Sequence, residues 1–171
     1  MNTDNASRQI QLEKITLNIG TGTGGEQLQR GMKLLEKLTK QTPLRRASKL
    51  RIPTWGVRPG LEVGCKVTVR GATANALLLR LLKAVDLQIP KKSFDPWGNF
   101  SFGIHEYLLI PGAEYDPEIG IVGLQVVVTL MRPGYRIARR RLLQRSVPRR
   151  QRITAEEATA YAQKQWGVIV V

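Results

Sequence analysis

Alternating apolar and polar residues predict several half-buried strands along this chain. In residues 14–20, Ile15, Leu17 and Ile19 alternate with polar side chains, and residues 61–71 and 123–130 repeat the same period of two. Successive side chains of a strand point to opposite faces of its sheet. Each of these segments therefore buries one face and leaves the other polar. A further strand is expected within residues 94–110, after a turn at residues 96–98.

Helical periodicity fills the gaps between these strands. Residues 26–38 and 72–87 carry apolar side chains at helical spacing. A third helix, residues 154–166, should begin with a capping box of Thr154 and Glu157 and stop at Gly167. The order of elements predicts an α+β fold, with a mainly antiparallel sheet, helices packed on one face, and a polar and basic opposite face. We expect a single domain spanning residues 1–171.

The face that the helices leave uncovered is expected to be rich in hydroxyls, amides and cations. Such groups suit the sugars and phosphates of a nucleic acid. The strand pattern alone leaves an ordinary solvated sheet face as an alternative. The residues concerned are Thr16, Asn18, Lys66, Thr68, Arg70, Gln125 and Thr129.

The charge distribution favours a nucleic acid as the partner. The chain has 27 Lys and Arg residues against 13 Asp and Glu residues, a formal net charge of +14. No acid lies between Glu36 and Glu62, or between Glu118 and Glu156, and the cations of residues 132–152 are all arginines. Guanidinium groups bind phosphate with two parallel hydrogen bonds, whereas a merely solvated surface would interleave acids with its cations. Proline and glycine interrupt this arginine-rich segment, which disfavours a membrane-binding helix.

Enzymatic functions find little support in the sequence. Gly20, Gly22 and Gly25 match a dinucleotide-binding pattern, but the acid expected about 20 residues further on is absent. The glycines more simply permit a tight turn before a helix, although a helix N-terminus can also receive a phosphate. The chain has one histidine, His105, and one cysteine, Cys65. These two residues are too few for a histidine- or cysteine-based metal site, and they do not indicate a catalytic nucleophile paired with a histidine base. We therefore expect no enzyme activity, cofactor or metal, and we expect a location in the reducing cytosol without a membrane partner.

Six ordered segments together resemble the archaeal and eukaryotic form of the large-subunit ribosomal protein family called L-five, which binds 5S rRNA. One departure from the family pattern is TKQTP, where Lys40 and Thr42 stand in a segment that commonly reads TGQKP. The matching segments are KITLNIGTG from Lys14, TKQTP from Thr39, GVRPGLEVGCKVTVRG from Gly56, FDPWGNFSFGIHEY from Phe94, EYDPEIGI from Glu114 and RPGYRIARRR from Arg132.

This resemblance implies a scaffolding role in the cytoplasmic ribosome. The expected partners are 5S rRNA at the central protuberance, large-subunit rRNA, P-site tRNA, and other ribosomal proteins including a small-subunit neighbour. The family likeness makes Asn18, Gln41 and Thr68 polar contacts to 5S rRNA. It also directs the loop of residues 52–64 toward the tRNA. For Trp55 in that loop, an alternative is an aromatic side chain folded onto the core.

Charge, strand pattern and resemblance together give two predicted groups of binding residues. The tRNA-proximal residues are Arg51, Trp55 and Arg58. The rRNA-binding residues are Thr16, Asn18, Gln41, Arg45, Arg46, Lys49, Lys66, Thr68, Arg70, Arg132, Tyr135, Arg136, Arg139, Arg140 and Arg141.

Overall fold

The computed structural model describes residues 5–22 and 24–171, and its centre is a five-stranded antiparallel sheet. The four predicted strands are confirmed, and a short edge strand, β2, adds a fifth. The order across the sheet is β2 (Leu44–Ala47), β3 (Glu62–Val69), β1 (Gln11–Gly20), β6 (Leu124–Met131) and β5 (Phe100–Ile104).

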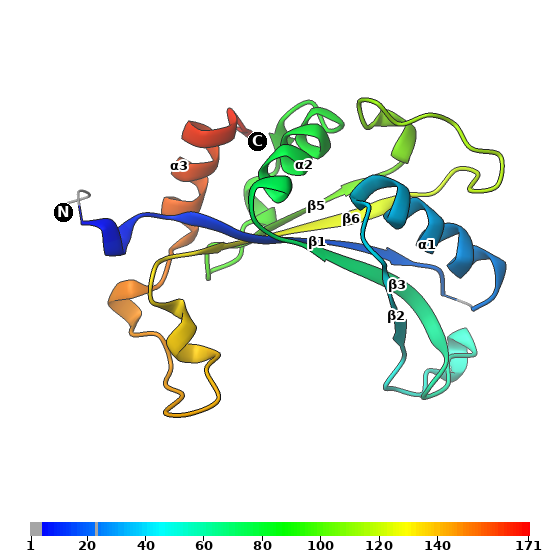
Figure 1. Ribbon diagram of the computed structural model, residues 1–171, viewed down its shortest axis with the longest axis horizontal. Coiled ribbons are helices and arrows are strands. Elements are labelled where there is room, and N and C mark those ends of the chain that lie inside the picture. The colour runs from blue at the N-terminus through cyan, green and yellow to red at the C-terminus, as the bar shows by residue number, and fades with distance from the viewer. Residues whose placement is uncertain (1–4, 23) are drawn as a thin grey trace.

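Three α helices lie on the same side of this sheet (Figure 1). They are α1 (Glu26–Thr39), α2 (Ala72–Lys83) and α3 (Ala155–Trp166). Their apolar faces and the apolar sides of the strands form one core, because Ile15 and Leu17 of β1 and Leu78 and Leu81 of α2 are all fully buried within it. The predicted α+β class with helices on one face is therefore confirmed.

Helix α1 packs closely against the sheet at Gly31. A Cβ atom added there would lie 3.2 Å from the Cys65 sulfur and 3.3 Å from the Ile19 Cγ2 atom. Because Gly31 has no side chain, the helix can approach the strands this closely. Cys65 is fully buried at this contact, and burial raises the pKa of its thiol to about 11. Cys65 is therefore a core residue.

The second predicted helix is shorter than its sequence pattern suggests. It ends at Lys83, and Asp86 and Leu87 adopt positive φ angles of 52° and 59°. The chain then enters β4 (Gln88–Ile89), which pairs in parallel with β7 (Ile169–Val170). The C-terminal residues are thereby joined to the end of α2, since the Val171 N–H donates to the Ile89 carbonyl at 3.1 Å.

Helix α3 begins and ends as the sequence predicts. Thr154 and Glu157 form the capping box, and Gly167 ends the helix with a left-handed φ of 68°. None of the helices in residues 5–22 and 24–171 is long and apolar enough to span a membrane. Short 3₁₀ helices at Ala6–Arg8, Pro53–Trp55, Lys91–Ser93, Tyr107–Leu109, Tyr135–Ala138 and Arg149–Gln151 complete the described secondary structure.

Candidate nucleic-acid interface

The side of the sheet opposite the helices, here called the open face, presents a row of polar side chains. Asn18 of β1 lies directly opposite Lys66 of β3 and Gln125 of β6, and Thr16 lies opposite Thr68 in the next row. Residues opposite each other in antiparallel strands point to the same face. Amide, ammonium and hydroxyl groups from three strands therefore meet on one surface, as the sequence predicts.

Two basic segments border the open face. The β2–β3 loop, residues 48–61, and the arginine segment, residues 132–152, both extend away from the helices at opposite ends of the sheet (Figure 1). Both are rich in cations and contain no acid. The open face thus lies between two positively charged flanks.

Internal hydrogen bonds hold the arginine segment in shape. The Tyr135 hydroxyl donates to the Gln151 carbonyl at 3.0 Å and accepts the Ile153 N–H at 3.1 Å. Burial raises the pKa of this phenol, Tyr135. Further along, the Arg140 Nε donates to the Leu143 carbonyl at 2.8 Å. The hydroxyl of Tyr135 therefore closes the segment onto itself, and the contact of Tyr135 with rRNA stays a prediction.

Arg132 is buried, unlike the other arginines predicted to bind rRNA. Its side chain is only 7% exposed, and its NH2 nitrogen donates to the Glu157 carboxylate at 2.8 Å. Its NH1 nitrogen donates to the Arg152 carbonyl at 3.2 Å. Burial alone would raise the pKa of Glu157, but the Thr154 N–H and Arg132 outweigh it and lower that pKa below its ordinary value. Arg132 thus ties α3 to the arginine segment, and its guanidinium is used within the protein.

A buried acid, Glu13, anchors two of the predicted arginines. It sits at a β-bulge between Leu12 and Lys14, and its side chain is 3% exposed. Its carboxylate accepts both terminal nitrogens of Arg139 and the NH1 nitrogen of Arg70, the latter at 3.0 Å. Burial would raise the pKa of Glu13, but these two arginines outweigh it and hold the pKa below its ordinary value. Glu13 was not predicted as a site residue, and the one sequence signal for it is an acid at a position where the alternation of Ile15, Leu17 and Ile19 would place an apolar side chain.

The remaining predicted cations divide into paired and unpaired groups. Arg45 lies opposite Cys65, on the helix side of the sheet, and bonds Glu62 at 3.1 Å. Most of the others are exposed, and no described residue accepts a hydrogen bond or ion pair from their side chains. These unpaired cations are Arg46, Lys49, Arg51, Arg58, Arg136 and Arg141.

Gln41 and Trp55 lie where RNA could reach them. Gln41 is exposed just after α1. The Trp55 side chain in the β2–β3 loop is 75% exposed. The alternative in which Trp55 folds onto the core is therefore wrong.

The glycine-rich turn after β1 does not form a dinucleotide site. Gly22 and Gly25 take positive φ angles of 70° and 97°, as a tight turn requires, and Thr23 lies outside the described residues. The sheet is antiparallel, whereas a dinucleotide fold needs parallel strands.

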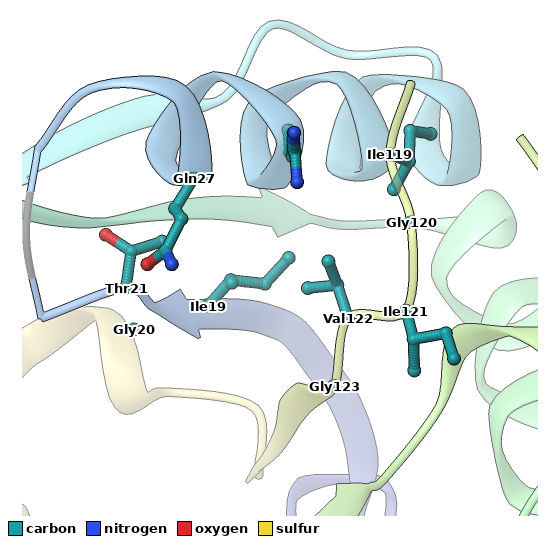
Figure 2. A pocket seen from close by; sticks show the side chains of 10 residues that line it. Ile19, Gly20, Thr21, Gln27, Ile119, Gly120, Ile121, Val122 and Gly123 are labelled. Atoms are coloured by element: carbon teal, nitrogen blue, oxygen red, sulfur yellow. The ribbon is translucent and has the colours of Figure 1, made fainter. Parts of the chain in front are cut away.

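A pocket of about 330 Å³ lies beside this turn, between the end of β1, the first turns of α1 and residues 119–123 (Figure 2). Arg30 is the one charged side chain among the described residues that line it. The pocket therefore lacks the acid, histidine or cysteine that catalysis there would use.

Comparison with known proteins gives full-length matches. A family model described as "Ribosomal protein L5" matches residues 5–58, and a second model, which describes the C-terminus of the same ribosomal family, matches residues 62–159. The large ribosomal subunit protein uL5 of Nanoarchaeum equitans is 48% identical over 165 residues, which cover 96% of this chain and 97% of the relative. The uL5 protein of Sulfurisphaera tokodaii is 46% identical over 170 residues, covering 99% and 96%. The matched regions include the open face and the arginine segment.

Proposed function

Because the chain belongs to the ribosomal protein L5 family, in its archaeal form, we propose that its open face and basic flanks bind 5S rRNA. Members of this family are structural constituents of the large ribosomal subunit and not enzymes. The protein accordingly acts in the ribosome, in the cytoplasm, where it contacts rRNA and other ribosomal proteins.

The observation that carries the proposal is the polar row of the open face between two cationic flanks. Cations give phosphate affinity that falls with salt, and they do so for any nucleic acid. Folded RNA is distinguished by its shape and by its 2′-hydroxyl groups, which amides and hydroxyls can bind. Asn18 and Thr68 supply such groups in the middle of the face. In this proposal the cations of the flanks supply affinity for phosphate, and the amides and hydroxyls of the open face supply selectivity for folded RNA.

We further propose that this contact helps attach 5S rRNA to the central protuberance, with the β2–β3 loop reaching toward P-site tRNA. The exposed ring of Trp55 and the unpaired side chains of Arg51 and Arg58 support a contact with RNA at this loop. A small-subunit protein is a further proposed neighbour.

Substitution of Asn18 tests the 5S rRNA proposal. Asn18→Ala should weaken binding to 5S rRNA about fivefold, since a lost hydrogen bond costs about 1 kcal/mol. The dependence of affinity on salt should not change, because no phosphate contact is removed. The measurement is a binding titration at several salt concentrations. Asn75→Ala is the matched control, because Asn75 is exposed on α2 in the opposite layer.

A competition experiment separates this function from general nucleic-acid binding through charge alone. The proposed function predicts that 5S rRNA displaces duplex DNA of equal length at moderate salt. Equal competition by the two, or an equal effect of Asn18→Ala on unrelated RNA, would reject selective recognition by the open face.

A further inference from the structure

A second cavity, of about 310 Å³, opens between the sheet and the arginine segment. The turn before β5 forms one wall, β6 forms the floor, and the folded arginine segment forms the opposite wall. Its lining is mostly apolar. The lining includes Trp97, Asn99, Thr129, Tyr135, Arg139 and Arg152.

The outer wall of this cavity is an aromatic ring stacked on a guanidinium group. Trp97 is 56% exposed, and the Arg152 guanidinium carbon lies 4.6 Å from the centre of its ring. The Arg152 Nε also donates to the Val147 carbonyl at 3.0 Å, which fixes the guanidinium over the ring. Trp97 and Arg152 thus form a flat cation–π platform at the edge of the pocket.

The turn that carries Trp97 is held by three hydrogen bonds to Asp95. One oxygen of the Asp95 carboxylate accepts the backbone N–H groups of Trp97 and Asn99, at 3.0 and 2.6 Å. Its other oxygen accepts the Asn99 side-chain amide at 2.9 Å. At Gly98 there is no room for a Cβ atom, because the Ile153 side chain lies directly against the glycine, so the turn packs tightly on Ile153. The platform therefore requires little ordering on binding.

We propose that this pocket receives one unpaired base of ribosomal RNA, stacked on Trp97. The inference rests on the proposed function and adds a base-accepting site to it. Single-stranded RNA is read by splaying out bases that stack on aromatic rings or guanidinium planes. The volume lies at the small end of the range for ligand pockets, which begins at about 300 Å³, so it suits a single base.

The positive charges around the pocket favour a nucleotide, which carries phosphates, over an uncharged apolar ligand. Arg152 and Arg139 line the pocket, and although Glu13 pairs with Arg139, the arginine segment that forms one wall contains no acid. The phosphates of a nucleotide whose base enters here would lie close to this cationic segment. At the floor, the Thr129 hydroxyl has no hydrogen-bond partner among the described residues and remains available to a base edge.

Trp97 variants test the site with two RNAs, purified 5S rRNA and purified large-subunit rRNA, titrated separately. Trp97→Ala should weaken binding to one of them about tenfold, because stacking on an aromatic side chain contributes about 1–3 kcal/mol per base. Trp97→Phe should restore most of the affinity, and neither variant should change the salt dependence. Tyr115→Ala is the matched control, since Tyr115 is similarly exposed on a distant loop. Unchanged thermal unfolding of Trp97→Ala should confirm that the variant folds.

Fluorescence gives a direct readout of stacking. In a Trp55→Phe background the remaining tryptophans are Trp97 and the buried Trp166. The RNA that occupies the pocket should quench the emission of Trp97.

The outcomes separate this proposal from the function on which it rests. Normal binding of both RNAs by Trp97→Ala, or a loss of affinity without quenching, would overturn the base pocket alone. Failure of the unaltered protein to bind either RNA would overturn both.

Discussion

Glu13 and Arg139 form a two-pronged ion pair across 126 residues of sequence, with both terminal nitrogens of the guanidinium on one carboxylate. The carboxylate is buried at a bulge of β1, and the guanidinium belongs to the arginine segment. Arg70, at the end of β3, donates to the same carboxylate. One acid thus holds the arginine segment against the edge of the open face. Its negative charge also offsets part of the repulsion among the arginines.

Removing the charge of Glu13 should loosen this attachment. We expect Glu13→Gln to lower the free energy of unfolding by about 1–2 kcal/mol, because charged hydrogen bonds are lost while both arginines stay half-exposed and solvated. Denaturant unfolding at neutral pH measures the change. Glu106→Gln, at an exposed site, should leave the stability unchanged. Equal effects of the two substitutions would show that the ion pair adds nothing to stability.

The lowered pKa of Glu13 predicts an acid-dependent part of the stability. The pKa in the folded state lies below the ordinary value of 4.5, so the contribution is fully present above that pH. It is lost as the pH falls through the lowered pKa, because the proton binds more readily to the unfolded chain. The stability difference between the parent protein and Glu13→Gln should therefore shrink on acidification. Urea unfolding from pH 7 to pH 3 tests this, and a difference independent of pH would argue against it.

Arg132 should behave as a structural residue, unlike its neighbours. Arg132→Lys keeps the charge but loses the fork that bonds Glu157 and two backbone carbonyls. We expect a loss of about 2–3 kcal/mol in stability, from breaking a buried charged network. The salt dependence of rRNA binding should stay the same. Arg136→Lys, at an exposed position without a partner among the described residues, should show no loss of stability by thermal unfolding.

Arg141 should contribute to binding through its charge. Its side chain is exposed on the arginine segment and is not used within the described structure. Arg141→Ala should reduce the slope of log affinity for 5S rRNA against log salt by about 1, as expected for one lost phosphate contact. Lys83→Ala removes a charge from the helix layer and should leave that slope unchanged. Identical slopes for Arg141→Ala and the parent protein would exclude a phosphate contact there.

Two glycines of the sheet should respond oppositely to alanine. A Cβ atom at Gly64 in β3 would lie 2.6 Å from the backbone oxygen of Ile19, which cannot move without displacing β1. We expect Gly64→Ala to destabilise the protein by about 1–3 kcal/mol. Gly103 in β5 has open space at the same position, so Gly103→Ala should be neutral or stabilising by up to about 1 kcal/mol. Calorimetric unfolding measures the stability of both variants. Equal stabilities of Gly64→Ala and Gly103→Ala would contradict the close approach of β3 to β1 at Gly64.

The sequence predicts the sheet and helices well where periodicity is strong. Residues 14–20 alternate cleanly because one side of β1 is core and the other is open. Strand β2 escapes prediction because all four of its residues are exposed at the sheet edge, so no alternation marks it. The short strands β4 and β7 carry too few residues to show any period, and each depends on the other for its hydrogen bonds.

The roles of individual arginines lie beyond what sequence can assign. Arg132 and Arg136 are four residues apart within the same basic segment, yet Arg132 is buried and Arg136 is exposed. The difference comes from Glu157 and the Arg152 carbonyl, which fold back to Arg132 from distant parts of the chain. The polar row of Thr16, Asn18 and Thr68 is easier to predict, because strand parity alone places it.

The parallel pairing of β4 and β7 has a practical consequence for experiments on this protein. Val171 is held beside Ile89, and Figure 1 shows the C-terminus among the helices, away from the two cationic flanks. A dye or affinity tag attached after Val171 would lie on the helix side of the sheet, opposite the open face. Immobilised through such a tag, the protein would present its open face and both basic flanks to solution.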